Sequence, residues 1–279
     1  MAGTLYLVAT PIGNLEDMTA RAARILGEVD LVAAEDTRRT GRLLQHLGIA
    51  KPLRSYYDAV ERERAPALVR ELLAGKSVAL VSDAGTPGIA DPGYRLVAAA
   101  IAAGVRVVPI PGPSAIAAFL PVSGLPTDRF AFEGFLPARQ GERRRKLAAL
   151  ASERRTLVFY ESGRRLAATL ADMAEAFGSR AAAVGRELTK LHEEVVRDEL
   201  RALAEHFGGR DVPGEVVLGV AGAPEADPAV AAEDLEDEIR RRRAAGETVR
   251  DLSDAIAAAR GVPRRSVYRL ALALERAPR

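Results

Sequence analysis

Charged side chains, glycine and proline are concentrated in four short segments of the first 120 residues, a combination typical of ligand-binding loops. Residues 10–15 read TPIGNL, residues 34–40 AEDTRRT, residues 82–93 SDAGTPGIADPG and residues 111–115 PGPSA. The third segment exceeds the about two to six residues of a plain connection, and its glycines and prolines fix an irregular backbone beside Asp83. In the fourth, Gly112 lets the backbone approach a ligand, while Ser114 and Ala115 leave room at a helix start. We therefore expect binding loops at both places.

The second segment allows two interpretations. Asp36 or Thr37 could cap the helix that follows, where acidic groups also suit the helix dipole. Equally, the charges of Glu35, Asp36 and Arg38 could form the rim of an active site. The residue types alone favour neither interpretation.

The sequence excludes several familiar kinds of site. Neither a G-x-G-x-x-G fingerprint nor a Walker A motif occurs, so an ordinary dinucleotide site and a P-loop hydrolase are not expected. The chain has no cysteine, which excludes a cysteine nucleophile, a thiolate zinc site and an iron–sulfur cluster. His46, His192 and His206 are isolated and lack ligand spacing, so we expect no metal centre.

The four segments each follow an apolar run that predicts a strand. Runs at 5–9, 31–34, 53–55, 78–81 and 105–109 alternate with helical patterns at 20–26, 38–47, 60–74 and 94–103, which is the order of βαβ units. Ligands bind at the carboxyl ends of parallel strands, so these segments should meet at one edge of a Rossmann-like sheet.

The rest of the 279 residues predicts a second α/β domain and a helical tail. After a link at 121–126, we expect strands at 129–133, 156–160, 181–185, 193–198 and 215–220, helices at 142–151, 165–177 and 200–206, and a sheet that mixes parallel and antiparallel pairs. A linker at 223–228 leads to helices at 233–245, 249–259 and 264–277. The expected domains are a Rossmann-like parallel-sheet domain at 1–120, a mixed-sheet α/β domain at 121–224 and an all-helical tail at 230–279.

Two segments of the nearly neutral chain are strongly basic. Residues 138–165 hold nine basic and three acidic side chains, and residues 239–279 hold eleven arginines and four acidic side chains. A polyanionic partner such as RNA would explain them, and so would a solvated face. The tail has the outline of a helix-turn-helix, although a cap or an oligomerisation element is the alternative. The arginines that could contact RNA are Arg143, Arg144, Arg145, Arg264, Arg265 and Arg269.

No membrane helix is expected. The longest uncharged run, residues 107–126, contains five prolines, which a spanning helix could hardly accommodate. The N-terminus runs into the first strand without a basic region, so we expect no secretory signal and a cytoplasmic location.

Seven ordered motifs carry a resemblance to a known family. They are LYLVATPIGNL at 5–15, EDTR at 35–38, SDAGTPG at 82–88, PGPSA at 111–115, FEGF at 132–135, YES at 160–162 and RELTK at 186–190. Together they resemble the tetrapyrrole methylase family over residues 4–222. Within that family they resemble a branch that methylates the ribose 2′-oxygen of a cytidine in the decoding centre of 16S ribosomal RNA. The resemblance implies two α/β domains, a homodimer, S-adenosylmethionine as the cofactor and 16S ribosomal RNA, within the 30S subunit, as the partner.

Carried over by position, the resemblance also implies a cofactor site in the cleft between the two domains. Its residues would be Pro11, Asp83, Thr86 or Ile89, Ser114, Ala115, Glu161, and Val217 or Leu218. The family's usual Gly-Asp-Pro is replaced here by SDA at 82–84, in a longer loop.

Methyl transfer to a ribose hydroxyl needs help in removing the proton, because the hydroxyl is a poor nucleophile. The carboxylate and lysine candidates are Glu35, Asp36, Glu133, Glu187 and Lys190, with Arg38 in the same charged cluster. Two alternatives stay open: a family member acting on a corrin ring or a modified protein histidine, and a non-catalytic RNA-binding protein of ribosome assembly.

Overall fold

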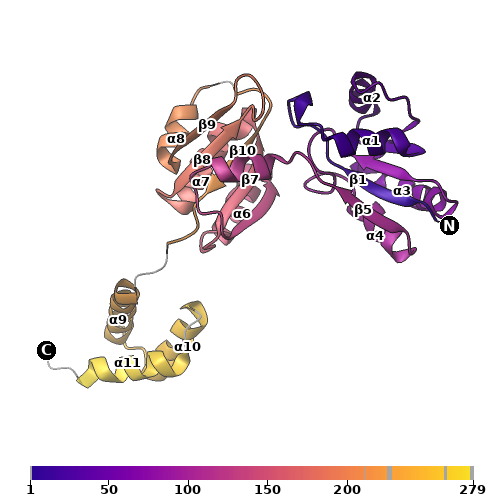
Figure 1. The fold of residues 1–279 in the computed structure, drawn as a ribbon. Helices are drawn as coiled ribbons and strands as arrows, with labels where there is room; N and C mark the ends of the chain where they lie inside the picture. Colours follow the sequence, from indigo (N-terminus) through magenta and orange to yellow (C-terminus); the bar gives the residue numbers. More distant parts are fainter. Residues whose placement is uncertain (1, 211, 225–227, 261–262, 277–279) are drawn as a thin grey trace. The chain divides into compact units, whose positions relative to one another are not determined.

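The computed structural model describes residues 2–210, 212–224, 228–260 and 263–276 (Figure 1). The chain divides into two compact units, Met1–Ala223 and Pro224–Arg279. The first unit contains two five-stranded sheets, and the second unit is helical. The α/β class and the helical tail expected from the sequence are therefore confirmed.

The first sheet is entirely parallel, in the order β3-β2-β4-β1-β5. All four residues of β2 and all four of β4 are buried, as expected for central strands covered by helices on both faces. Apolar side chains form one core on each face of this sheet. The strands are β1 (Thr4–Val8), β2 (Leu31–Ala34), β3 (Leu53–Ser55), β4 (Val78–Val81) and β5 (Arg106–Ile110).

Four helices cover this sheet, and local signals fix their ends. Thr19 and Asp36 cap the first two with their side chains, and Gly48, Gly75 and Gly104 follow three of the helices with φ angles of 69°, 96° and 72°. The helices are α1 (Ala20–Glu28), α2 (Thr37–His46), α3 (Asp58–Leu73) and α4 (Tyr94–Ala102). A short 3-10 helix, Leu15–Asp17, precedes α1.

The second sheet is mixed, as its sequence pattern predicts. In the order β6-β7-β10-β8-β9, the first pair is parallel and the other three pairs are antiparallel. Its strands are β6 (Phe130–Phe135), β7 (Thr156–Ser162), β8 (Ala181–Arg186), β9 (Glu194–Glu199) and β10 (Glu215–Val220). Helices α6 (Gln140–Ala149), α7 (Leu166–Phe177) and α8 (Leu200–Phe207) accompany it, and the 3-10 turn Gly163–Arg165 precedes α7.

A short helix packs against the mixed sheet, and it begins where the sequence predicted a helix start, at Ser114 and Ala115. It is α5 (Ala115–Phe119), followed by the 3-10 turn Leu120–Val122. Phe119 is fully buried, and a Cβ atom on Gly185 would lie 2.6 Å from its ring. The glycine in β8 therefore admits the ring, which holds the loop before α5 close to the second sheet.

The helical unit has its own apolar core. It consists of α9 (Pro228–Ala244), α10 (Val249–Arg260) and α11 (Arg264–Arg276), with Ile239, Leu252, Ile256, Val267 and Ala271 buried between them. Within the described ranges, no helix combines the length and the apolar character needed to span a bilayer. Residues 225–227 of the predicted linker and 261–262 of the predicted turn lie outside the described residues.

Candidate active site

The loops at the carboxyl ends of the parallel strands are tied to one another by hydrogen bonds. The backbones of Thr10, after β1, and Gly85, after β4, exchange two bonds of 2.8 and 2.9 Å. The Thr86 hydroxyl donates to the carbonyl of Pro113, after β5, at 3.2 Å. The residues expected to meet at this edge of the sheet therefore form one connected rim.

The loop after β2 joins the same rim through a reciprocal pair of bonds. The backbone N–H of Asp36 donates to Asp83 Oδ1 at 3.0 Å, and the N–H of Asp83 donates to Glu35 Oε2 at 3.1 Å. Arg39 lies 3.5 Å from the other oxygen of Asp83. Asp83 thus joins two loops and also faces the cavity described next.

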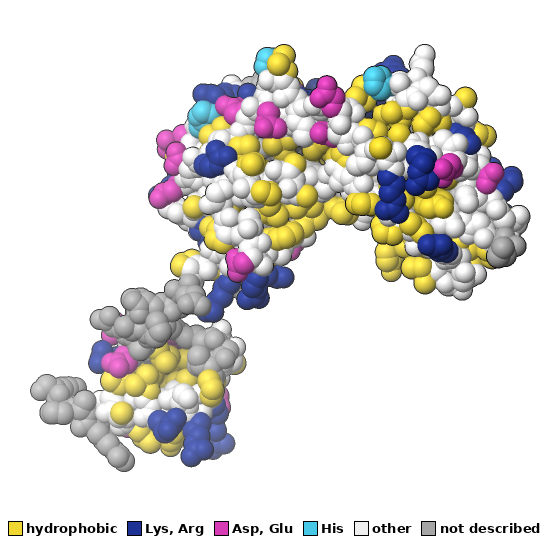
Figure 2. All heavy atoms as spheres, viewed as in Figure 1, with side chains coloured by type: hydrophobic (Ala, Val, Ile, Leu, Met, Phe, Trp, Pro, Cys, Tyr) yellow, Lys and Arg dark blue, Asp and Glu magenta, His cyan; other side chains and the backbone are white. Residues whose placement is uncertain are grey.

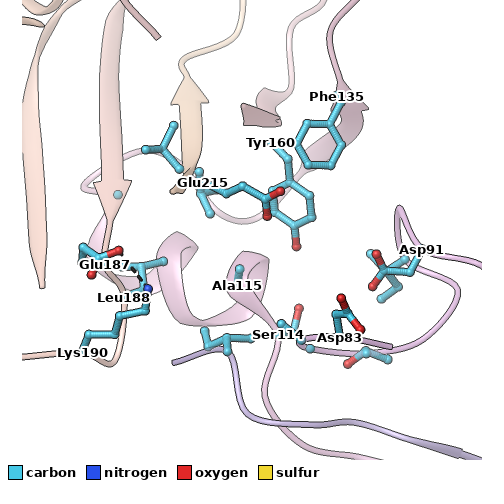
Figure 3. Close-up of a pocket in the computed structure, with 18 of the residues that line it drawn as sticks. Asp83, Asp91, Ser114, Ala115, Phe135, Tyr160, Glu187, Leu188, Lys190 and Glu215 are labelled. Carbon is cyan, nitrogen blue, oxygen red and sulfur yellow. Dashed lines mark hydrogen bonds and ion pairs between the residues drawn. The ribbon is translucent and has the colours of Figure 1, made fainter. Parts of the chain in front are cut away.

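A cavity of about 380 Å³ opens beside this rim and is closed on its other side by the mixed sheet (Figure 3). Its volume lies within the range of small-molecule sites, about 300–1,000 Å³. The rim contributes Ile12, Glu35, Arg39, Asp83, Ala84, Gly85, Thr86, Ile89, Asp91, Ser114 and Ala115. The second sheet and its loops contribute Phe135, Tyr160, Gly185, Glu187, Leu188, Lys190, Glu215, Val216 and Val217.

Nine of the residues singled out from the sequence line this cavity. Thr86 and Ile89, the two alternatives for one cofactor contact, both line the cavity. Of the other pair of alternatives, Val217 lines the cavity, whereas Leu218 packs in the core on the opposite face of the sheet. The nine are Glu35, Asp83, Thr86, Ile89, Ser114, Ala115, Glu187, Lys190 and Val217. Pro11, Asp36, Arg38, Glu133, Glu161 and Leu218 are not among the lining residues.

Glu161 is held in the protein interior and does not face the cavity. Its carboxylate has no exposed surface and accepts hydrogen bonds of 2.7 Å from the N–H of Ser162, Arg165 Nε and the Thr169 hydroxyl. Side chains alternate along a strand, so its neighbour Tyr160 faces the cavity instead. The sequence assignment was therefore one residue away from the side chain that lines the site.

Asp36 caps helix α2, and neither Asp36 nor its partner Arg38 lines the cavity. Asp36 accepts the N–H of Arg38 at 2.8 Å and pairs with its guanidinium at 2.7 Å, and these bonds lower the pKa of Asp36 far below its usual range. Of the two interpretations of this segment, the structure supports the cap for Asp36 and the cavity wall for Glu35. Glu133, on β6, faces Lys146 of α6, 3.4 Å from its ammonium.

Three cavity residues with a carboxyl or phenol group were missed because the sequence offers them only weak signals. Asp91 lies in the same loop as Asp83 and shares the cavity wall, and Tyr160 and Glu215 face it from the second sheet (Figure 3). Among the described residues, Ala90, Glu187 and Thr189 are the non-glycine residues with positive φ, and all three lie in loops that line the cavity. Backbone strain of this kind is concentrated at functional sites.

Burial and mutual repulsion of carboxylates control protonation in the cavity. Burial, followed by the charge of Glu35, raises the pKa of Asp91 to about 6, although a hydrogen bond from Ser82 opposes the shift. Burial likewise raises the pKa of Glu35. Burial and the charge of Asp91 raise the pKa of Tyr160 to about 12, so the phenol stays protonated and can donate a hydrogen bond at neutral pH.

A buried glutamate outside the cavity holds the loop of Asp91 in place. Glu61, on α3, accepts the N–H groups of Gly93 and Arg95 at 3.0 and 3.2 Å, and the Tyr56 hydroxyl at 3.1 Å. Gly93 has no side chain to cap α4, so Glu61 caps that helix from another element. Glu61 therefore fixes the end of this loop at Gly93, two residues after Asp91.

Lys190 reaches the cavity across a glycine. A Cβ atom on Gly13 would lie 2.7 Å from Lys190 Cγ, so only glycine lets the lysine side chain lie over this loop. Its ammonium then pairs with Glu187 Oε1 at 2.9 Å. The TPIGNL and RELTK motifs, far apart in the sequence, are thus two parts of one wall.

The arginines proposed for RNA differ in accessibility. Arg143 is buried and paired with Asp172, with 2.7 Å between Arg143 Nε and the carboxylate, so it is not available to a partner. Arg144 is shared between Asp172 and Glu175, and Arg145 is exposed. In the helical unit Arg264 pairs with Asp254, whereas Arg265 and Arg269 are exposed.

Comparison with known proteins places this geometry in a family. Residues 4–204 match the sequence profile of Tetrapyrrole (Corrin/Porphyrin) Methylases. A ribosomal RNA small subunit methyltransferase I from Synechocystis sp. is 50% identical over 275 residues, which cover 98% of this chain and 99% of the relative. The protein of that name from Pseudomonas aeruginosa is 50% identical over 239 residues, 84% of this chain and 85% of the relative.

Solved structures share the fold at lower identity. The methyltransferase CobJ matches with a TM-score of 0.60 and 20% identity, covering 81% of this chain and 98% of its own. A uroporphyrin-III C-methyltransferase from Thermus thermophilus, complexed with S-adenyl homocysteine, matches with a TM-score of 0.54 and 24% identity, covering 77% and 97%. The chain therefore belongs to the tetrapyrrole methylase family and, within it, to the group of the ribosomal RNA small subunit methyltransferases I.

Proposed function

We propose that this protein transfers a methyl group from S-adenosylmethionine to the ribose 2′-oxygen of a cytidine in 16S ribosomal RNA, at position 1402 of the decoding centre. The observation that carries the proposal is the cavity in which the TPIGNL, SDAGTPG and RELTK motifs meet. The names of relatives about 50% identical over most of the chain support an RNA substrate. We further propose that the protein is a homodimer that acts on the 30S subunit in the cytoplasm.

The groups that line the cavity suit S-adenosylmethionine. The molecule has a cationic sulfur, an ammonium, ribose hydroxyls and a flat adenine, and the cavity combines several carboxylates with apolar and aromatic walls. In our proposal Asp83 and Asp91 bind cationic or hydroxyl groups, and Ile12, Ile89 and Val217 provide apolar contacts. Ser114 and Ala115 leave space, because their side chains are small.

When bound, S-adenosylmethionine supplies a methyl group attached to a positively charged sulfur. The chain must then orient the acceptor hydroxyl about 3–3.5 Å from that carbon and accept its proton. Glu35 is a suitable acceptor because its carboxylate faces the cavity and burial raises its pKa. Lys190 is fixed by Glu187 and would orient the ribose or the adjacent phosphate.

The acidic cavity wall also gives Tyr160 a role. Its protonated hydroxyl faces the space between Ser114 and Asp83 (Figure 3), where it can donate to an oxygen of a bound ligand. We propose that Tyr160, rather than Glu161, provides the contact of this strand, because Glu161 already uses its oxygens within the core.

Incubation of the purified chain with tritium-labelled S-adenosylmethionine and 30S subunits from a strain that lacks the modification tests the proposal. Nucleoside mass spectrometry of the product should find 2′-O-methylcytidine at one position of 16S ribosomal RNA. Naked 16S RNA, a corrin substrate and a histidine-containing protein substrate serve as comparisons. Methyl transfer to a base, a corrin or a protein with unmodified ribose would contradict the proposal, and so would the absence of transfer with intact cofactor binding.

A further inference from the structure

The helical unit has a concavity of its own, at the amino-terminal ends of two helices. Arg250 of α10 and Arg264, Arg265 and Tyr268 of α11 line it, and we call it the α10–α11 concavity. Residues three or four positions apart share one face of a helix, so Tyr268 lies beside both arginines of α11. Lys and Arg side chains gather on part of the visible face of this unit (Figure 2).

Packing of the helical unit does not account for this group of side chains. Val267 and Ala271 of α11 are fully buried in the three-helix core, whereas Tyr268 keeps 40% of its surface exposed. Arg250, Arg264 and Arg265 are exposed as well. The open tyrosine ring therefore offers a flat face for stacking directly beside positive charge.

The charges of the concavity are incompletely neutralised. Arg264 pairs with Asp254, and Asp251 accepts the Thr248 hydroxyl at 2.7 Å. Within the described part of the chain, neither Arg250 nor Arg265 has an acidic partner. Two free guanidinium groups beside an open aromatic ring match a ligand that combines an anion with a flat ring.

We infer that the α10–α11 concavity binds one nucleotide of single-stranded RNA, with the phosphate on Arg250 and Arg265 and the base stacked on Tyr268. Guanidinium groups bind phosphate oxygens in a bidentate manner, and a tyrosine ring stacks on any unpaired base. A base within a duplex does not present its face, so the ring selects unpaired RNA. The inference rests on the proposed function only in taking RNA as the substrate.

Binding of short fluorescein-labelled RNAs to the full chain tests the site. Tyr268→Ala should weaken binding of a single-stranded oligocytidine about tenfold, and Tyr268→Phe should retain it, because the phenyl ring still stacks. Arg250→Gln and Arg265→Gln should each reduce the log–log salt slope by about 0.7. Arg240→Gln is the matched control, since Arg240 is exposed in the same unit but paired with Glu236 and Asp237.

Three further ligands separate the alternatives. An abasic oligomer should bind equally to the wild type and to Tyr268→Ala, and a duplex should not depend on Tyr268. Polyglutamate should compete poorly. Equal loss in Tyr268→Ala and Tyr268→Phe, an equal dependence of duplex binding on Tyr268, or effective competition by polyglutamate would each overturn the inference. Thermal melting of every variant excludes unfolding as the cause of a loss.

The same variants distinguish failure of this inference from failure of the proposed function. If the wild type methylates 30S subunits but its RNA affinity does not depend on Tyr268, only the inference is wrong. If the wild type binds single-stranded RNA through Tyr268 but transfers no methyl group, only the proposed function is wrong. Cofactor affinity, measured by calorimetry, should be the same for all tail variants.

Discussion

The cavity of the first unit and the α10–α11 concavity of the helical unit have opposite chemistry. Among the described residues that line the cavity there are five carboxylates, those of Glu35, Asp83, Asp91, Glu187 and Glu215, and two cationic side chains. Three arginines and a tyrosine line the concavity, and no acidic side chain is among its described lining residues. An acidic cavity favours a cationic cofactor, and a basic concavity favours a polyanionic substrate. The difference indicates that the binding of cofactor and of RNA can be altered separately.

The largest expected effect is loss of methyl transfer on removing the charges proposed to act on the acceptor. Glu35→Gln should lower kcat by about 10²- to 10⁴-fold, the usual contribution of general acid–base catalysis. Lys190→Ala should also lower kcat, because Lys190 is proposed to orient the acceptor. RNA affinity should change little, since the concavity is untouched. Single-turnover transfer to 30S subunits measures the first quantity and filter binding the second.

Asp36→Asn, Arg38→Gln and His192→Ala are the controls for that prediction. All three side chains lie outside the lining of the cavity, so their variants should keep kcat within about threefold of the wild type if folded. A catalytic loss confined to one of these controls would show that the proton acceptor has been misplaced.

Variants of Glu161 test whether this carboxylate stabilises the fold rather than binding the cofactor. Glu161→Ala leaves Arg165 and Thr169 without their buried partner, and breaking such a pair typically costs about 3–5 kcal/mol of unfolding free energy. Denaturant titration should reveal this loss. If Glu161→Ala remains folded, it should bind S-adenosylmethionine with unchanged affinity. A weakened cofactor affinity in a stable Glu161→Gln variant would instead show that Glu161 contributes to cofactor binding.

The sequence predicted the elements well because their periodicity is local. The bounds of β2, β3, β4 and β10 agree with the expected ranges, and the loops after the parallel strands meet as expected. What failed depends on the tertiary structure. Arg143 was named among the arginines that could contact RNA because its buried partner, Asp172, lies 29 positions away along the chain.

The cavity residues show the same limit. Tyr160 was missed in favour of Glu161 because the face of β7 is decided by the partner sheet, and a shift of one residue reverses every side chain. Asp91 was overlooked because two aspartates occupy one loop, and composition cannot say which of them faces a ligand. The start of helix α5 was expected, but its five residues are too few for a periodic signal that would give its length.

Asp91→Asn should separate cofactor affinity from stability. Loss of the carboxylate should weaken binding of S-adenosylmethionine about tenfold or more, measured by calorimetry, if Asp91 contacts a cationic group as proposed. The matched variant Asp83→Asn should also weaken binding, but at a cost in stability, since Asp83 accepts the N–H of Asp36. A change of less than twofold in cofactor affinity for both variants would show that the cofactor does not bind at this end of the cavity.

The pKa of Asp91 also predicts a pH dependence. Folding raises this pKa from 3.8 to about 6, so the folded state keeps its proton to a higher pH than the unfolded state. Stability of the wild type should therefore fall as pH rises from about 4 to about 6, by about 1 kcal/mol after allowing for the half-exposed position. Asp91→Asn should lack this component, and cofactor affinity of the wild type should weaken below about pH 6.

Glu61 should have a smaller effect on the cavity, exerted through the loop that ends at Gly93. Glu61→Ala leaves two N–H groups and the Tyr56 hydroxyl without their acceptor, which we expect to cost about 2–3 kcal/mol of stability. Cofactor affinity should fall several-fold through the displaced Asp91. Glu61→Gln keeps an accepting oxygen and should recover most of the affinity, a difference that general destabilisation would not produce.

The smallest expected effect is that of a single exposed arginine in the helical unit. Arg269 lies one turn beyond Arg265 on α11, outside the lining of the concavity, and could contact a neighbouring phosphate. Arg269→Gln should lower RNA affinity only about two- to threefold and reduce the salt slope by about 0.7, without the preference for unpaired bases that Tyr268 confers. Titrations at several salt concentrations measure the slope. A loss of RNA affinity as large as that of Tyr268→Ala would mean that charge, rather than stacking, accounts for RNA binding by the helical unit. The concavity and the acidic cavity would then differ in charge alone.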